Sequence, residues 1–79
     1  MRSAYILVKV RPNKSSINVL NKVENLPIVK EAVTTYGEYD LLIKVNFSNF
    51  KELTMFIYDV LRLIPEAGST TTMVVAKMK

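Results

Sequence analysis

The sequence has no cysteine and no histidine among its 79 residues. Without cysteine it can form no disulfide and offers no thiolate nucleophile, and without histidine it lacks the commonest ligand of transition metals. We therefore predict no metal site and no cofactor. Catalysis would have to use carboxylates, lysines, tyrosines or hydroxyls, and only Glu38 and Asp40 are near neighbours on a predicted strand. Because an aspartate beside a turn usually caps that turn, we predict no catalytic residue and no enzymatic activity.

Long apolar runs are also missing. No stretch approaches the roughly 20 residues of a membrane span. The N-terminus lacks the charged, apolar and small-residue regions of a signal peptide. These absences predict a cytoplasmic chain with no membrane partner.

Basic residues outnumber acidic ones, 11 to 7, but they are spread along the chain and form no basic run. A nucleic-acid surface needs basic side chains gathered on one face or interleaved with stacking aromatics. The expected third strand, Leu41 to Val45, lacks the glycines and aromatics of the RNA-recognition motif, and no glycine-rich phosphate loop is present. We predict no direct contact with nucleic acid.

What the sequence does contain is a β-hairpin between Val29 and Phe47. Its β-branched, aromatic and aliphatic residues surround a turn at residues 37–40, Gly-Glu-Tyr-Asp. Gly37 is the only glycine in the first 67 residues. A glycine permits positive φ and lets a ligand approach the backbone closely. The hairpin is therefore predicted to organise the sheet and, secondly, to be a candidate site.

A strand and a helix are predicted before this hairpin. Residues 3–10 have the side-chain alternation of a strand, although both of its faces are largely apolar, which suggests that both sides of the sheet are covered. Residues 14–25 have helical spacing, with Ile17, Leu20 and Val23 on one face. Asn13, Ser15 or Ser16 is available to cap this helix.

A second helix and a last strand are predicted after the hairpin. Asn49 and Glu52 resemble a capping box. A broad apolar stripe follows, made of Leu53, Phe56, Ile57, Val60, Leu61 and Ile64. Pro65 ends the helix, Gly68 supplies a turn position, and four hydroxyl residues at 69–72 lead into a strand at 73–76.

The order β-α-β-β-α-β predicts a single domain over residues 1–79 of the α+β class, with the ferredoxin-like βαββαβ arrangement. Its four-stranded antiparallel sheet would carry both helices on one face. The other face would keep apolar side chains drawn from Tyr5, Leu7, Leu42 and Met73 or Val75. Because such a patch is rarely left exposed on a monomer, we predict a face-to-face homodimer, a dimeric α+β barrel.

The hairpin tip has the groups that a small zwitterion needs. A free amino acid presents an ammonium beside a carboxylate, so its site requires an acceptor next to backbone N–H donors. Gly37 and its neighbours offer N–H groups, Asp40 offers an acceptor, and Thr70 or Thr72 offers a hydroxyl.

Three segments together resemble the effector-binding module of the Lrp/AsnC family of feast/famine transcription regulators, the RAM domain (regulation of amino acid metabolism). They are the strand at residues 4–10, the hairpin at residues 33–42 with its G-x-Y-D motif, and the ending from Leu63 to Val75. The resemblance covers essentially the whole chain, and G-x-Y-D is its most specific element.

This resemblance implies a protein that binds an amino acid effector and forms homodimers, which assemble into rings, commonly octamers or decamers. Full members also carry a helix-turn-helix domain, and this sequence starts at the first strand of the module. It therefore resembles a stand-alone RAM protein that would act with or against full-length Lrp/AsnC-type regulators. The implied effector-binding residues are Tyr36, Gly37, Tyr39, Asp40, Thr70 and Thr72.

Two residues depart from the family pattern, and one alternative function stays open. Glu66 stands where the family usually has glycine, and Tyr36 stands where it commonly has threonine. The alternative is a small enzyme of the dimeric α+β barrel type, or a generic small-molecule-binding protein. A cavity within each protomer lined by Tyr5, Lys9, Lys44 and Asp40 would favour that alternative.

Overall fold

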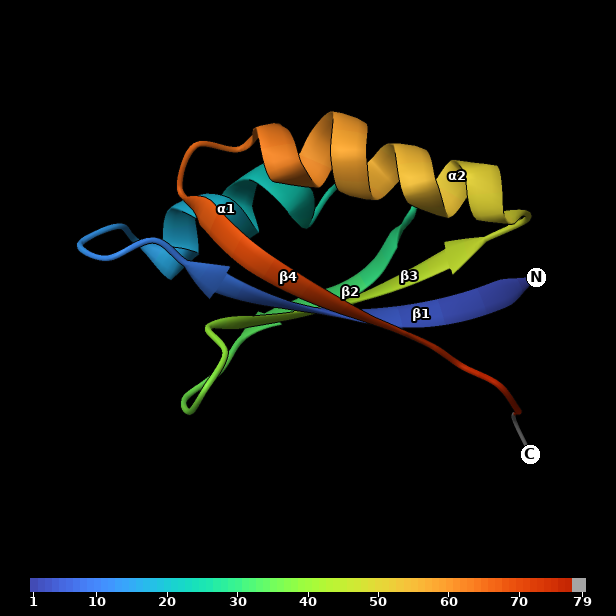
Figure 1. Cartoon of the computed structure of the whole chain (residues 1–79), viewed down its shortest axis with the longest axis horizontal. Helices are drawn as coiled ribbons and strands as arrows, with labels where there is room; N and C mark the ends of the chain where they lie inside the picture. Colours follow the sequence, from blue (N-terminus) through green and yellow to red (C-terminus); the bar gives the residue numbers. More distant parts are fainter. Residues whose placement is uncertain (78–79) are drawn as a thin grey trace.

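The computed structural model describes residues 1–77 and places two helical segments over one face of a four-stranded sheet (Figure 1). The strands are β1 (Arg2–Val10), β2 (Val29–Thr34), β3 (Leu41–Phe47) and β4 (Ala67–Val74). The helices are α1 (Ser16–Val23) and α2 (Phe50–Met55), and α2 continues as a π-helical turn (Phe56–Val60) and a 3₁₀ turn (Leu61–Leu63). The strand order is β2-β3-β1-β4 with antiparallel neighbours, which confirms the predicted ferredoxin-like βαββαβ fold.

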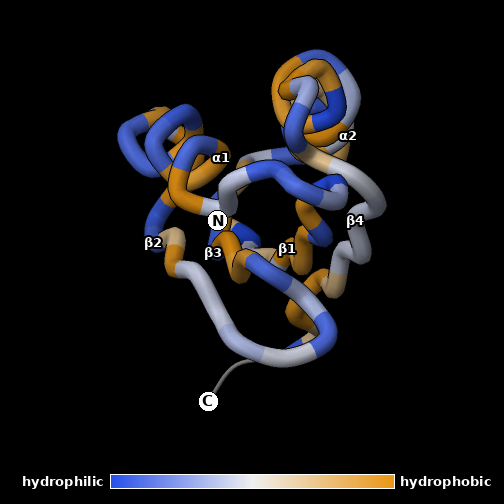
Figure 2. Tube along the Cα trace, turned by 90° about the vertical axis from the view of Figure 1, so that its left-hand side faces the viewer, coloured by the Kyte–Doolittle hydropathy of each residue, from blue (hydrophilic) through white to orange (hydrophobic). Residues whose placement is uncertain are grey.

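The core lies between the sheet and the two helices, which Figure 2 shows side by side on the same side of the sheet. Period-two alternation turns one set of side chains from each central strand toward the helices. In β1 and β3 these residues are fully buried: Ala4, Ile6, Val8, Leu41, Ile43, Val45 and Phe47. No helix in the described part of the chain is long and apolar enough to cross a membrane.

Helix α1 buries a different stripe from the predicted one. Val23 is buried as expected and Leu20 is half-buried, but Ile17 is 51% exposed and Val19 is fully buried in its place. Val19 and Val23 are one helical turn apart, so they share the face that packs on the sheet. Ser15 occupies the N-cap position but makes no side-chain capping bond, so only the position of the predicted cap is confirmed.

Helix α2 begins as predicted but changes its helical period after one and a half turns. Asn49 Oδ1 accepts a hydrogen bond from the Glu52 N–H (3.0 Å), and Glu52 Oε1 accepts one from the Ser48 N–H (2.9 Å). The π-helical turn then inserts an additional residue per turn. As a result Phe56 and Leu61 both face the core, whereas Val60, expected in the core stripe, is 38% exposed.

Strand β4 starts earlier than predicted, at Ala67 rather than at Met73, and ends at Val74. The β-branched threonines pair with β1, with Thr70 opposite Val8 and Thr72 opposite Ile6. Gly68 is not a turn residue but part of this strand, beside the bulge between Val8 and Val10. A Cβ atom at Gly68 would lie 2.8 Å from the Lys9 carbonyl oxygen, so the two backbones can approach this closely only because a glycine is present.

The face of the sheet turned away from the helices carries the predicted apolar side chains. Leu7 pairs with Leu42, which in turn pairs with Val33, and Tyr5 pairs with Met73. Tyr5, Leu7 and Leu42 are only half-buried there, and Met73 is 49% exposed. We call this surface the open sheet face.

Candidate functional site

The β2–β3 hairpin tip projects from one end of the sheet, where β1 ends and β4 begins (Figure 1). Gly37 has φ +124°, a backbone conformation that L side chains rarely adopt, and no atom lies within 4 Å of the position its Cβ would take. Tyr36, next to it, is fully exposed. The tip is closed by a hydrogen bond from the Thr35 N–H to the Asp40 carbonyl oxygen (2.9 Å). The glycine therefore shapes the turn and leaves open space around it.

Asp40 joins this tip to β1 through its backbone and its side chain. Its N–H donates to the Val8 carbonyl oxygen (2.9 Å), and its Oδ2 accepts a hydrogen bond from the Val10 N–H (2.7 Å). The β1–β3 ladder has its last pair at Val8 and Leu41, so Asp40 satisfies an N–H that the ladder leaves unpaired. One carboxylate oxygen of Asp40 thus has a structural role, and the other, Oδ1, has no hydrogen-bond partner among residues 1–77.

Tyr39 connects the tip to β4. Its hydroxyl lies 3.1 Å from Thr71 Oγ1, and its carbonyl oxygen accepts a hydrogen bond from Thr35 Oγ1 (2.7 Å). The Lys9 ammonium lies 5.7 Å from the centre of the Tyr39 ring, within the range of a cation–π interaction. Tyr39 therefore contacts Thr35, Thr71 and Lys9, and it lies at the edge of the open sheet face.

The predicted threonines do not share a face of the sheet with Tyr39. Thr70 and Thr72 pair with Val8 and Ile6, so they lie on the helix-covered side and are half-buried. Thr71 lies on the opposite side and makes the contact with Tyr39, a role that the sequence did not assign to it. An earlier start of β4, with strict alternation through residues 67–74, would have placed Thr71 on the open sheet face.

The tip offers donors and an acceptor to a ligand. The backbone N–H groups of residues 36–39 have no hydrogen-bond acceptor within the described part of the chain. Together with Asp40 Oδ1 they supply N–H donors for a carboxylate and an anionic acceptor for an ammonium. These are the kinds of group that a zwitterion requires, and they include no pair of acid and base for proton transfer.

Glu66, one of the two departures from the family pattern, forms an ion pair with Lys22. Its Oε1 lies 3.0 Å from the Lys22 ammonium, and this contact links the start of β4 to α1. The hydrogen bond from Lys22 is the main reason that the pKa of Glu66 lies below its ordinary value of 4.5. A glycine at this position would lack that link.

The four residues that the enzyme alternative places around one cavity lie on the open sheet face and at the hairpin tip. Tyr5 and Lys44 lie on the open sheet face, where the Lys44 ammonium is 5.7 Å from the centre of the Tyr5 ring. Lys9 and Asp40 are engaged at the hairpin tip. The cavity described below is lined by other residues, and residues 1–77 contain no group of three or more carboxylates that could hold a metal ion.

Comparison with known sequences identifies the family of this chain. The family model described as the Lrp/AsnC ligand binding domain matches residues 3–79. The HTH-type transcriptional regulator FL11 of Pyrococcus horikoshii is 38% identical over 74 residues, which are 94% of this chain and 48% of that protein. The chain therefore spans about half the length of the curated relatives it matches.

Comparison with solved structures gives the same fold. The crystal structure of FFRP-DM1 is 40% identical, with a TM-score of 0.87, and the match covers 95% of this chain and 99% of that one. A complex of the Neisseria meningitidis transcriptional regulator NMB0573 with L-Met is 23% identical, with a TM-score of 0.85 over 96% of this chain and 50% of that one. At that identity the second match shows the fold alone.

Proposed function

Because the chain belongs to the Lrp/AsnC ligand-binding domain family, we propose that its residues bind an amino acid at the hairpin tip and convert that binding into a change of assembly. The observation that carries this proposal is that the hairpin tip holds both N–H groups without an acceptor, at residues 36–39, and a carboxylate oxygen without a donor, Oδ1 of Asp40, among the described residues. These groups match the two charges of an amino acid. The proposed effector-binding residues are Tyr36, Gly37, Tyr39 and Asp40, with Thr71 as the link to β4 and with Thr70 and Thr72 behind it.

The open sheet face supports the assembly part of the proposal. It holds a continuous apolar strip around Leu7 and Leu42 that only another apolar surface would cover well. A second copy of the chain provides such a surface by two-fold symmetry. Tyr39 lies at the edge of this face, so an effector at the tip would contact a residue that borders the dimer interface. Dimers would then join into an octamer or decamer.

Any effect of this chain on transcription would be indirect. We propose that these 79 residues act in the cytoplasm by co-assembling with full-length Lrp/AsnC-type regulators, and not by contacting DNA or catalysing a reaction. The relative FL11 is a transcriptional regulator by name, and the FFRP-DM1 chain has nearly the same extent as this one. The description of the matching family model, a ligand binding domain, supports the effector-binding role.

Titration calorimetry with each proteinogenic amino acid in turn tests the sensor role. We expect saturable binding of at least one of them, and we expect Gly37→Val to abolish that binding, because a β-branched residue cannot adopt φ +124° without strain. Ile17→Val, a change at an exposed position on α1, is the matched control. If no amino acid produces heat with the wild-type protein, the sensor role is wrong and only an assembly module remains.

A further inference from the structure

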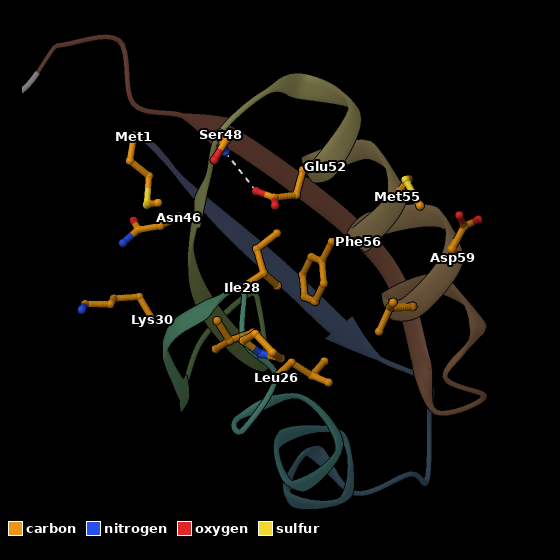
Figure 3. Close-up of a pocket in the computed structure, with 13 residues that line it drawn as sticks. Met1, Leu26, Ile28, Lys30, Asn46, Ser48, Glu52, Met55, Phe56 and Asp59 are labelled. Atoms are coloured by element: carbon orange, nitrogen blue, oxygen red, sulfur yellow. Dashed lines mark hydrogen bonds between the residues drawn. The ribbon is translucent and has the colours of Figure 1, made fainter.

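A second candidate site lies at the other end of the molecule from the hairpin tip. A cavity of about 560 Å³ opens between α2 with its π-helical turn and the connection from α1 to β2 (Figure 3). Asn46 and Ser48, at the end of β3, form part of its wall, whereas the hairpin tip lies at the beginning of β3. Small-molecule sites typically have volumes of about 300–1,000 Å³. The cavity is therefore large enough for a ligand of its own.

The inner wall of this cavity is apolar. Leu26 and Ile28 contribute from the connection before β2, and Met55, Phe56 and Val60 contribute from the helical side. Figure 3 shows Ile28 and Phe56 facing each other across its middle. Phe56 is nearly completely buried, so the floor of the cavity is part of the rigid core.

Val60 lines this cavity because of the π-helical turn. Its φ of −122° and ψ of −66° lie outside the helical range, and the next N–H, that of Leu61, bonds to the carbonyl oxygens of Ile57 and Phe56. In a regular helix Val60 would follow Phe56 by one turn and enter the core. Single π-helical turns are uncommon and occur frequently at functional sites. The turn is thus an independent indication that this wall serves a ligand.

The charged side chains around the cavity differ in direction. Glu52, an exposed residue, extends from α2 toward Ser48 along one edge of the cavity, whereas Lys30 and Asp59 stand at its two ends and point away (Figure 3). Glu52 Oε1 accepts the Ser48 N–H, and its Oε2 has no hydrogen-bond partner among residues 1–77. Of these three charged side chains, Glu52 is therefore the one that a ligand in the cavity could reach.

We propose that this cavity binds a hydrophobic amine, that is, a short aliphatic or aromatic group carrying a single ammonium. The apolar body would contact Ile28, Phe56 and Val60, and the ammonium would donate a charge-assisted hydrogen bond to Glu52 Oε2. A ligand with a carboxylate would be repelled by Glu52, and the Lys30 ammonium points away from the cavity (Figure 3). The site shares no residue with the hairpin tip, so it does not depend on the proposed effector function.

Hexylamine, hexanol and hexanoate form a probe series with the same alkyl chain and three charge states. We would titrate each into the methyl-labelled wild-type protein and follow the methyl signals by NMR. We expect hexylamine to shift the signals of Leu26, Ile28 and Val60 in a saturable way and to leave those of Val33 and Leu41 unchanged. Hexanol should bind about tenfold more weakly, because it lacks the charge-assisted bond, and hexanoate should not bind.

Two pairs of variants locate the site. Glu52→Gln keeps an oxygen for the Ser48 N–H but loses the charge, so hexylamine should bind about tenfold more weakly to it. Glu24→Gln, at the exposed end of α1, should bind like the wild type. Val60→Trp should fill the cavity and abolish binding, whereas Leu63→Trp, at a strongly exposed position outside the cavity, should not.

Several results would overturn the proposal. The absence of saturable methyl shifts with hexylamine would show that the cavity holds no amine. Equal affinity for hexylamine and hexanol, or an unchanged affinity in Glu52→Gln, would remove the role of the carboxylate. Shifts confined to Val33 and Leu41 would place the amine at the hairpin instead. None of these results bears on amino acid binding, which the calorimetric titrations measure separately.

Discussion

At the scale of single residues, Asp40 has a structural role, and we propose that it also binds the ammonium of an effector. Its Oδ2 accepts the Val10 N–H, and hydrogen bonds to charged groups contribute about 1.5–3 kcal/mol. We therefore expect Asp40→Ala to lower the free energy of unfolding by about that amount in urea denaturation, without loss of the fold.

Asp40→Asn separates the two roles. The amide keeps an oxygen for the Val10 N–H, so this variant should be more stable than Asp40→Ala, yet it lacks the charge that would hold an ammonium. We expect both variants to bind an amino acid effector more weakly than the wild type in calorimetry. If Asp40→Asn binds it normally, Asp40 only caps the turn.

The ion pair between Glu66 and Lys22 should make the free energy of unfolding depend on pH in acid. The pKa of Glu66 is lowered in the folded protein, mainly by the hydrogen bond from Lys22, so folding favours the ionised carboxylate. The contribution of the ion pair is therefore present above the pKa of the unfolded chain and is lost as the pH falls through the lower folded value. Denaturation curves of wild type and Glu66→Gln should differ at neutral pH and converge in acid below the ordinary value of 4.5. A difference that persists in acid would contradict this assignment.

At the scale of secondary structure, the π-helical turn decides which side chains of the second helix stabilise the core. Val60 is partly exposed and Leu61 is fully buried. We expect Leu61→Ala to destabilise the protein by about 2–5 kcal/mol and Val60→Ala by less than about 1 kcal/mol in thermal or chemical denaturation. A regular helix through this segment would make both changes costly, so equal losses would contradict the π-helical turn.

The same turn shows where sequence periodicity stops being informative. The positions of β1, β2 and β3, the capping bond at Asn49 and the buried faces of β1 and β3 followed from alternation and capping patterns, because these are local. The phase of the helix after Phe56 did not, since one inserted residue per turn leaves no mark in an apolar run. The start of β4 was missed for a related reason: Gly68 looks like a turn residue, and its need for glycine arises from the Lys9 carbonyl on another strand.

Some residues of the candidate site could likewise be predicted from the sequence, and others could not. The turn at Gly37 and the acceptor at Asp40 could be predicted from residue chemistry alone. Thr71 could not, because its partner Tyr39 lies 32 positions away and the pairing depends on the strand order. The cavity between the π-helical turn and the connection before β2 had no sequence signal either, since it forms where that turn displaces Val60.

At the scale of the whole molecule, the open sheet face is the surface through which we propose that the chain dimerises. Leu42 lies between Leu7 and Val33 on this face and is half-buried within the protomer. Leu42→Glu would place a charge in the centre of a dimer interface, where it would have no partner. We expect this variant to remain folded by circular dichroism and to run as a monomer in light scattering. Ile17→Glu, on the exposed side of α1, should leave the dimer intact.

The most direct test of the central claim is the mass of the assembly, measured by light scattering coupled to size-exclusion chromatography with and without amino acids. We predict a dimer or a larger ring in the absence of ligand, and a shift between assembly sizes with the amino acid that binds in calorimetry. The shift should be absent in Gly37→Val. A monomer at micromolar concentration, or a mass that no amino acid changes, would contradict the account of this chain as an effector-responsive assembly module.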